Sequence, residues 1–294
     1  MTTLKTLSIV LPAKDEGPSL ALLLPKLTAA FPTAEVIVVD DGSSDDTAAI
    51  CARHAVARVH HPYSMGNGAA IKSGARASSG DLIVFMDADS QHDPEEIQKL
   101  LDRIDEGYDM AVGARDASSQ ASLARRLANG FYNRFASWMT EQRIADLTSG
   151  FRAVDANRFR EFLHLLPNGF SYPTSITMAF FRAGYLVSYV PITAHRRIGR
   201  SHIRPLKDGI RFLLIIFKVG TLFSPLKIFV PIAGVFATLG LLWYTYTFAQ
   251  FGRFTNMSAL LFINAIIVFL IGLVSEQITT LLYRDTPRRR RSDS

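Results

Sequence analysis

Two long stretches without a charged residue, 228–252 and 254–275, constrain the fold of this chain more than any other feature. Each exceeds the roughly 20 residues that an α-helix needs to cross the hydrocarbon core of a bilayer. Only Arg253 separates the two stretches, so the helices are expected to form a hairpin. Buried helices of a water-soluble core are the alternative, but two such stretches in succession rarely fit one core. We therefore expect two transmembrane helices within residues 222–283.

Basic residues gather at both outer ends of the expected hairpin. Arginines occupy positions 288–291, after the second stretch, and eight lysines and arginines fall between residues 196 and 227, before and at the start of the first. By the positive-inside rule, both ends of the hairpin then face the cytosol. The sequence opens with a strand pattern instead of an apolar signal segment, so residues 1–203 are also expected in the cytosol. These features predict an integral protein of the bacterial inner membrane or of an equivalent cytosol-facing membrane.

The excess of basic residues and the single cysteine limit the class of protein further. The 294-residue chain has a formal net charge of +6. Nucleic acid is a common partner of basic proteins, but here the charges lie beside the apolar stretches, where anionic lipid headgroups are nearer. We therefore expect a lipid bilayer and no nucleic acid among the partners. Cys51 is the only cysteine, so no intrachain disulfide can form, which agrees with a reducing compartment.

Apolar runs alternate with helical patterns across the first 115 residues. The expected strands are residues 7–11, 36–39, 57–60, 82–86 and 110–113, and the expected helices are residues 19–30, 47–54, 69–77 and 94–104. Such alternation predicts an α/β fold, with a parallel sheet that carries helices on both faces. Ligands bind such sheets at the carboxyl ends of the strands. The polar clusters of this sequence fall there, at residues 12–16, 40–44 and 87–91 and at Arg115.

The remaining sequence suggests how the chain is divided. Helices are expected at 122–140 and near 157–165, with a short strand at 187–190 and a turn-rich stretch at 146–152. Residues 205–218 are amphipathic, which favours a helix in the membrane interface, although a helix docked on the preceding domain is the alternative. The expected domains are a cytosolic domain at 1–203, an interfacial helix at 204–221, two transmembrane helices at 222–283 and a basic cytosolic tail at 284–294.

Two carboxylates, Asp87 and Asp89, follow directly on the apolar run at 82–86. A buried strand would deliver both to one open edge of the sheet. Hard oxygen ligands of this kind hold Mg²⁺ or Mn²⁺, usually together with a phosphate-bearing substrate. An acidic turn without a ligand is the alternative. The strand before the pair, the helix start after it and a second acidic strand end at Asp40 and Asp41 favour a metal site.

Other loops at the same expected edge are compatible with a nucleotide. A carboxylate in residues 40–44 could accept hydrogen bonds from a nucleobase N–H or a ribose hydroxyl, and a plain helix cap is the alternative. Residues 12–17 end the first strand without a Gly-x-Gly-x-x-Gly pattern, which argues against an ordinary dinucleotide-binding site. Residues 66–68, Gly-Asn-Gly, precede a helix whose N-terminus could meet phosphate, and a simple loop explains them equally well.

Taken in order, these motifs resemble the family-two glycosyltransferases of the GT-A fold, of the dolichol-phosphate mannose synthase type. The motifs that carry the resemblance are residues 11–16, 38–47, 66–80, 86–94, 112–115, 146–152 and 196–201. The Asp-x-Asp-x-Gln-His run, the Thr-Ser-Gly-Phe-Arg run and the Arg-x-x-Gly-x-Ser loop point to the polyprenyl-phosphate glycosyltransferases within that family. The implied fold is α/β: a Rossmann-like, mostly parallel GT-A catalytic domain, then the interfacial helix and the transmembrane hairpin.

The resemblance also implies roles for particular residues. Those that would hold the nucleotide sugar are Pro12, Ala13, Glu16, Asp40, Asp41, Asp87 and Ala88. Those that would hold Mg²⁺ or Mn²⁺ are Asp87, Asp89 and Gln91. The implied catalytic residues are Asp87, Asp89 and Arg115, the last of them near the sugar or the acceptor. The candidates for the lipid phosphate are Arg126, Ser149, Arg196 and Arg200; guanidinium groups pair with phosphate in bidentate fashion.

The activity that the resemblance implies is a metal-dependent, inverting transfer of a hexose, mannose or glucose, to a polyprenyl phosphate such as dolichyl or undecaprenyl phosphate. The donor would be a nucleotide-diphosphate sugar, and the reaction would take place at the cytosolic membrane face. Two alternatives stay open: a membrane transferase with a hydroxyl acceptor in polysaccharide synthesis, and a non-catalytic membrane adaptor that keeps the fold. The first is disfavoured because the chain has only two expected spans and no apparent pore-forming bundle. The second is disfavoured because the acidic residues Asp40, Asp41, Asp87 and Asp89 are all present. Homo-oligomerisation stays open.

Two positions depart from the family pattern. Gly150 stands before Phe-Arg where some relatives have an aspartate, and Asp146 is the nearest acid. A phosphate acceptor is already an anion at neutral pH and needs little deprotonation, so this departure need not disable the enzyme. Lys14 stands where an aromatic residue is common, which leaves the base specificity undetermined.

Overall fold

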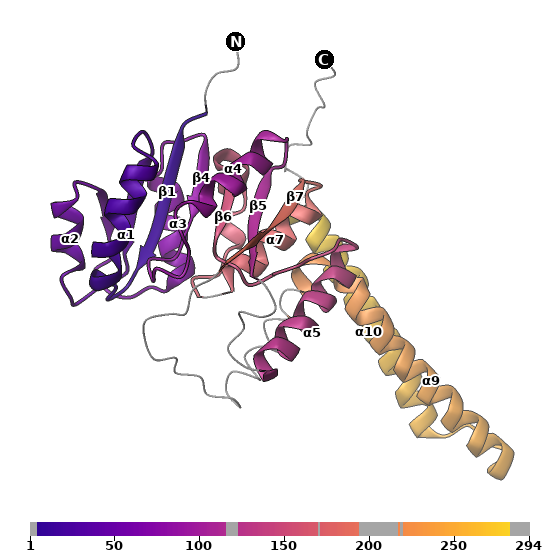
Figure 1. Cartoon of the computed structure of the whole chain (residues 1–294). Coiled ribbons are helices and arrows are strands. Elements are labelled where there is room, and N and C mark those ends of the chain that lie inside the picture. The colour runs from indigo at the N-terminus through magenta and orange to yellow at the C-terminus, as the bar shows by residue number, and fades with distance from the viewer. Residues whose placement is uncertain (1–4, 116–122, 170, 194–216, 218–219, 283–294) are drawn as a thin grey trace. The chain divides into compact units, whose positions relative to one another are not determined.

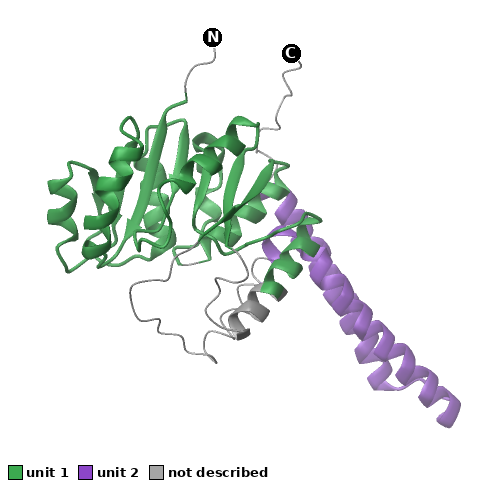
Figure 2. Ribbon diagram, viewed as in Figure 1, with its two compact units in different colours: residues 1–203 green, residues 204–294 purple. Residues whose placement is uncertain are grey.

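The computed structural model describes residues 5–115, 123–169, 171–193, 217 and 220–282 (Figure 1). The chain divides into two compact units, residues 1–203 and residues 204–294 (Figure 2). The first unit is a sheet with helices packed against it, and the second is a helical hairpin.

The first unit is built on a seven-stranded sheet with the order β3-β2-β1-β4-β6-β5-β7. Its strands are β1 (Leu7–Ala13), β2 (Glu35–Asp40), β3 (Ala57–His60), β4 (Leu82–Phe85), β5 (Met110–Arg115), β6 (Arg152–Asp155) and β7 (Val187–Ile192). The pairs β1–β2, β1–β4, β2–β3 and β5–β7 are parallel, whereas β6 runs antiparallel to both β4 and β5. The sheet is therefore mixed but mostly parallel, as the GT-A resemblance implies.

Helices connect these strands and cover the sheet (Figure 1). They are α1 (Gly17–Ala30), α2 (Thr47–Arg53), α3 (Asn67–Ala77), α4 (Glu96–Asp105), α5 (Leu123–Thr140), α6 (Ala156–Glu161) and α7 (Tyr172–Arg182), with a 3₁₀ turn at η2 (Leu163–Leu165). All four residues of β4 are buried, which is why this strand reads as an unbroken apolar run. Gly74 brings α3 close to the sheet, because a Cβ there would lie 2.2 Å from Cγ1 of Val10.

The structure confirms the helices and strands expected in the first 115 residues. Farther along the chain it has two elements that were not expected, β6 and α7. Strand β6 lies at the end of the stretch expected to be turn-rich, and its first residue is the fully buried Arg152, so it has no apolar run to mark it. Helix α7 is buried from Tyr172 to Phe180. A helix buried on all sides lacks the one-sided apolar stripe by which helices are recognised in a sequence.

The second unit contains the two helices expected from the uncharged stretches, α9 (Pro225–Phe251) and α10 (Asn256–Leu282). Each helix has 27 residues. In its most apolar segment of 18 residues, α9 has a mean hydropathy of 1.9 and α10 one of 2.7. Only 11% of that segment is buried in α9, and only 17% in α10. At a rise of 1.5 Å per residue each helix is about 40 Å long, enough to span a bilayer. Such exposed apolar surface fits lipid better than a water-soluble core.

Small side chains let α9 and α10 pack closely. The buried positions recur every seven residues, at Ala233, Gly240 and Thr247 on α9 and at Ser258, Ala265, Gly272 and Thr279 on α10. A Cβ at Gly272 would lie 2.7 Å from Cβ of Phe229, so this glycine is required for the close approach. Small residues have the same role in many transmembrane helix pairs. The expected interfacial helix at 204–221 lies almost entirely outside the described residues.

Candidate active site

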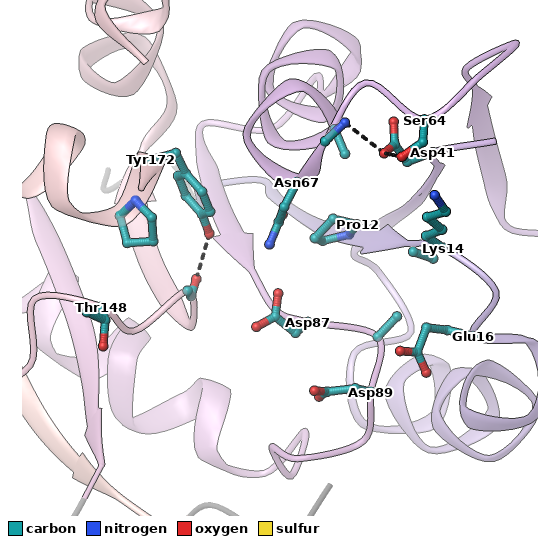
Figure 3. Close-up of a pocket in the computed structure, with 16 residues that line it drawn as sticks. Pro12, Lys14, Glu16, Asp41, Ser64, Asn67, Asp87, Asp89, Thr148 and Tyr172 are labelled. Carbon is teal, nitrogen blue, oxygen red and sulfur yellow. Dashed lines mark hydrogen bonds between the residues drawn. The ribbon is translucent and has the colours of Figure 1, made fainter. Parts of the chain in front are cut away.

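A pocket of about 400 Å³ opens at the carboxyl ends of β1 and β4, within the first unit (Figure 3). Parallel strands place the loops that follow them at this edge, and ligands bind α/β sheets there. The predicted site residues that line the pocket are Pro12, Ala13, Glu16, Asp41, Asp87, Ala88 and Asp89. Asp40, Gln91, Arg115 and Ser149 are not among the lining residues.

Asp87 and Asp89 form the acidic floor of this pocket. Figure 3 shows both carboxylates beside the central space, Asp87 directly below Asn67 and Pro12. Two neighbouring carboxylates are a donor set that fits Mg²⁺ or Mn²⁺, which complete their coordination with substrate phosphates and water. Among the described residues no group of three or more His, Cys, Asp or Glu side chains could hold a metal ion. The pocket therefore fits a metal that is shared with a phosphate-bearing ligand better than a closed protein cage.

The backbone around Asp89 is held in a tight turn. Ser90 has a φ of 57°, in the left-handed region, and the main-chain N–H of Gln91 donates to Oδ1 of Asp89 at 3.2 Å. An aspartate that accepts a hydrogen bond from the residue two positions on forms an Asx turn. Gln91 thus contacts Asp89 through its main chain, while a role for its side chain as a metal ligand stays a prediction.

Asp41 organises the loop that forms another wall of the pocket. Its carboxylate accepts hydrogen bonds from Oγ of Ser64 at 2.8 Å and from the main-chain N–H groups of Met65 at 2.8 Å and Gly66 at 2.9 Å, and it pairs with Nδ1 of His61 at 2.7 Å. Burial by itself would raise the pKa of Asp41, but these hydrogen bonds lower it below its usual value. Asp41 therefore stays ionised and fixes the loop.

Asp40 lies beside Asp41 in the chain but faces a different environment. Its Oδ1 accepts the main-chain N–H of Ser43 at 2.8 Å, and its Oδ2 lies 3.7 Å from Arg58 and 3.4 Å from His60 of β3. Only 2% of Asp40 is exposed, and it does not line the pocket. A direct contact of Asp40 with the nucleoside stays a prediction, since the structure shows it bonded within the protein.

Arg115, at the end of β5, is held by Asp146 and Thr148. Its Nε and Nη2 donate to the two oxygens of the Asp146 carboxylate at 2.8 and 3.2 Å, and Nη2 also donates to Oγ1 of Thr148 at 2.7 Å. Burial alone would lower the pKa of Arg115, but the pair with Asp146 and the charges of Asp87 and Asp89 raise it. Arg115 therefore stays positively charged, and both pocket carboxylates favour its charged form.

The Arg115–Asp146 pair gives a testable dependence of stability on pH. Burial would raise the pKa of Asp146, but the bond to Arg115 lowers it below the usual 3.8. A carboxyl whose pKa is lowered by folding stabilises the protein above its unfolded pKa and loses this effect as the pH falls through its folded pKa. We expect Asp146→Asn to lower the free energy of unfolding by about 2 kcal/mol near neutral pH, because it weakens a buried, bidentate pair.

The difference in the free energy of unfolding between wild type and Asp146→Asn should be largest above pH 3.8 and should become smaller as the pH falls below this value. Denaturant unfolding of the detergent-solubilised chain across this range measures the difference. A difference that stays constant as the pH falls would show that the Asp146 charge does not stabilise the fold.

Some residues that shape the pocket were not predicted from the sequence. Asn67, Thr148, Tyr172 and Pro173 line it, and Figure 3 shows the Asn67 amide and the Tyr172 hydroxyl directed toward the central space. The Gly-Asn-Gly motif marked the position of Asn67 but not its contact with the pocket. Tyr172 and Pro173 begin the unpredicted helix α7, so no sequence signal identified them.

The predicted lipid-phosphate residues are only partly described. Ser149 is 2% exposed, and within the described part of the chain its Oγ has no hydrogen-bond partner. Arg126 lies on α5, but its side chain is outside the described residues, as are Arg196 and Arg200 altogether. Their role in acceptor binding therefore stays a prediction.

Two family models match the chain. The model of glycosyl transferase family 2 matches residues 8–164, and the model of the GtrB C-terminal hairpin matches residues 224–281. The two matches correspond to the sheet-containing unit and to the pair of apolar helices, respectively.

Curated relatives match half to two thirds of the chain. The undecaprenyl-phosphate 4-deoxy-4-formamido-L-arabinose transferase of Klebsiella pneumoniae subsp. pneumoniae is 36% identical over 159 residues, which are 51% of this chain and 48% of that protein. The polyprenol monophosphomannose synthase of Mycolicibacterium smegmatis is 30% identical over 213 residues, 66% of this chain and 79% of that protein. This chain thus spans about half the length of the former relative.

Solved structures share the fold. Glucosyl-3-phosphoglycerate synthase from Mycobacterium tuberculosis, in complex with Mn²⁺, UDP and glucosyl-3-phosphoglycerate, superposes with a TM-score of 0.59 at 21% identity, over 74% of this chain and 79% of that one. The same enzyme in complex with Mg²⁺ and UDP superposes with a TM-score of 0.56 at 23% identity, over 72% of this chain and 79% of that one. At this level of identity the likeness shows the GT-A fold alone.

Proposed function

The chain belongs to glycosyl transferase family 2, and we propose that it transfers a hexosyl group from a nucleotide-diphosphate sugar to a polyprenyl phosphate at a membrane surface. The names of its relatives, an undecaprenyl-phosphate sugar transferase and a polyprenol monophosphomannose synthase, support this acceptor class. Mannose and glucose are the hexoses that we propose first.

The observation that carries the proposal is the pair of carboxylates at the end of β4. Asp87 and Asp89 lie in a pocket of about 400 Å³ at the sheet edge where this fold binds ligands. The same chain carries two apolar helices long enough to span a bilayer. A site for an anionic, phosphate-bearing donor and a membrane anchor are what a transferase acting on a lipid phosphate requires.

We assign the pocket residues to the donor as follows. Asp87 and Asp89 would hold Mg²⁺ or Mn²⁺, which when bound neutralises charge on the departing diphosphate. Pro12, Ala13 and Glu16 also line the pocket, and we propose that the nucleoside binds against them. We propose that Arg115, which donates hydrogen bonds to Asp146 and Thr148, supplies a fixed positive charge near the sugar or the acceptor.

The acceptor needs no strong base in this mechanism. The acidic residues that line the pocket, within the described part of the chain, are Glu16, Asp41, Asp87 and Asp89. Asp41 is occupied by internal hydrogen bonds, and the two at β4 are assigned to the metal. A phosphate monoester is already ionised at neutral pH, so its oxygen can attack the anomeric carbon from the face opposite the diphosphate, with inversion. Arg126, Ser149, Arg196 and Arg200 remain our candidates for holding that phosphate.

We propose that residues 1–203 form the cytosolic catalytic domain and that residues 222–283 anchor it. Under this scheme the interfacial helix is 204–221 and the basic tail is 284–294. The family match to a C-terminal hairpin at 224–281 supports the anchor. The basic residues on both sides of the hairpin support a cytosolic location for both of its ends.

This topology makes a prediction. A reporter fused after Ser294 should be accessible only from the cytosol, because the hairpin crosses the membrane twice and basic residues flank both ends. The control is the same reporter inserted after Gly252, between the two spans, which should be accessible only from the opposite side. An external location for the reporter after Ser294 would contradict the two-span arrangement.

The proposed activity is tested with the purified full chain in detergent. It should be incubated with Mn²⁺, undecaprenyl or dolichyl phosphate, and a panel of radiolabelled nucleotide sugars that includes GDP-mannose and UDP-glucose. Label is expected in the lipid extract for one donor or a few, and only when metal is present. Label that stays in the aqueous phase with every donor would contradict the proposal.

A further inference from the structure

Among the residues that the structure describes, Arg152 is the largest side chain that is completely buried, and it does not line the pocket. It is the first residue of β6, and it pairs in the sheet with Phe85 of β4 and Val112 of β5. Within the described part of the chain, its guanidinium forms no ion pair with a carboxylate. Removing a charge from water without an ionic partner costs free energy of folding, and hydrogen bonds must offset that cost. The hydrogen bonds of Arg152 therefore show what its burial achieves.

Those contacts join two segments that form one wall of the pocket. Nη2 of Arg152 donates to the main-chain carbonyl of Ser149. Nη1 donates to the main-chain carbonyl of Pro173 at 3.4 Å and to Oγ1 of Thr177 at 3.3 Å. The guanidinium carbon also lies 5.7 Å from the centre of the Tyr172 ring, a cation–π distance. One side chain thus connects the loop before β6 with the first turns of α7.

The wall that Arg152 holds faces the acidic floor. The Tyr172 hydroxyl donates to the carbonyl of Gly150 at 3.3 Å, as Figure 3 shows. A Cβ placed on Gly150 would lie 3.3 Å from Oδ2 of Asp87 and 3.1 Å from the Tyr172 hydroxyl. The position of this loop therefore sets how much space remains beside the Asp87 carboxylate. A displacement of the wall by a fraction of an ångström would change that space directly.

A guanidinium suits this task for chemical reasons. It stays protonated even when burial lowers its pKa, and its planar fork can reach several acceptors in fixed directions. An apolar side chain of similar volume would satisfy the core equally well without the cost of desolvation. Lysine would keep the charge but would not bond the Ser149 and Pro173 carbonyls from two nitrogens at once.

We propose that Arg152 is a positioning residue for the transfer reaction: it holds the Ser149–Gly150 loop and the Tyr172–Pro173 turn together, so that the space beside Asp87 keeps the shape the reacting phosphates require. This inference rests on the proposed transferase function. It differs from a purely structural role, because it places the effect of Arg152 in turnover and not only in stability.

The test compares Arg152→Lys with a matched control, Arg160→Lys. The Arg160 side chain also donates to main-chain carbonyls, those of Ala75 at 2.9 Å and Ser78 at 2.6 Å, but at the opposite end of the sheet from the pocket. Both variants are expected to lower the melting temperature of the full chain. Only Arg152→Lys should lower kcat, by about tenfold or more, since small misplacements at a reacting centre have effects of that size. Its KM for the nucleotide sugar should change less than about threefold, because the nucleoside side of the pocket is untouched.

A second variant covers the case in which Arg152→Lys does not fold. Thr177→Val removes one acceptor of Arg152 at nearly constant volume, together with the hydrogen bond that Oγ1 of Thr177 donates to the Pro173 carbonyl at 2.8 Å. It should lower kcat about fivefold or more. An equal change in kcat for Arg152→Lys and Arg160→Lys would overturn the assignment, and so would unchanged turnover in Thr177→Val where Arg152→Lys does not fold.

Amide hydrogen exchange separates this inference from the proposed function. Arg152→Lys should speed exchange at Gly113, whose N–H donates to the Phe151 carbonyl at 2.9 Å, and at Ser175, whose N–H donates to the Ser171 carbonyl at 3.2 Å, whereas Arg160→Lys should not. This readout needs no transfer activity. Wild-type protein that fails to transfer sugar would contradict the proposed function, and unchanged exchange at these two amides would contradict the positioning role.

Discussion

Asp89→Ala is expected to lower sugar transfer by about a thousandfold, because it removes a carboxylate from the proposed metal site, and metal ions supply several kcal/mol of charge stabilisation in such reactions. The chain should remain folded, since Asp89 lies in a turn at the end of β4 and not in the apolar core. The loss should be measured as kcat/KM at limiting and at saturating Mn²⁺. Binding of a nucleoside diphosphate with Mn²⁺, followed by calorimetry, should weaken in parallel.

Asp93→Ala is the matched control for Asp89→Ala. Oδ1 of Asp93 accepts the main-chain N–H of Glu95 at 3.2 Å, just as Oδ1 of Asp89 accepts that of Gln91 at 3.2 Å. Both substitutions therefore remove an equivalent turn contact, but Asp93 is exposed and does not line the pocket. Asp93→Ala should keep activity within about twofold of wild type. Full activity of Asp89→Ala at limiting Mn²⁺ would remove this carboxylate from the mechanism.

Gly150→Asp is expected to reduce kcat/KM by about a hundredfold or more. The new Cβ would lie 3.3 Å from Oδ2 of Asp87, so the added carboxylate would bring a second negative charge next to the first. Two like charges 4 Å apart repel each other by about 4 kcal/mol in a partly polar environment. The added charge would also repel the phosphate of the acceptor from the space that Gly150 leaves open.

Two further variants separate charge from crowding at position 150. Gly150→Asn has nearly the same size as the aspartate without its charge, and Gly150→Ala adds only the Cβ. We expect activity to fall in the order Ala, Asn, Asp, with the largest step between Asn and Asp. Equal activity of the Asn and Asp variants would mean that crowding against the Tyr172 hydroxyl, 3.1 Å from the new Cβ, is the dominant effect.

The sheet could be predicted from the sequence where its strands are unbroken apolar runs. Strand β4 and most of β1 and β2 are buried, so their sequences show such runs directly. Strand β6 could not be predicted, because its first residue is a buried arginine and its partners are distant in sequence. Helix α7 is buried on nearly all sides, so its sequence has no amphipathic period.

The acidic floor of the site could also be predicted, but its walls could not. Asp87 and Asp89 follow a recognisable strand, and the structure places both in the pocket. The sequence did not distinguish Asp40 from its neighbour Asp41, whereas in the structure Asp41 lines the pocket and Asp40 faces β3. Successive side chains along a strand point to opposite sides, so adjacent identical residues can have different environments. The contribution of Tyr172 depends on a tertiary contact, which no local pattern encodes.

The most direct measurement of the central claim is a comparison of acceptors with one donor. The purified chain, with Mn²⁺ and the nucleotide sugar it accepts, should be offered a polyprenyl phosphate, the corresponding polyprenol without phosphate, and 3-phosphoglycerate as a soluble phosphate. We predict a glycosyl phosphodiester with the polyprenyl phosphate, of inverted anomeric configuration by NMR, and little or no product with the other two. Comparable transfer to the polyprenol hydroxyl, or preferred transfer to 3-phosphoglycerate, would contradict the account.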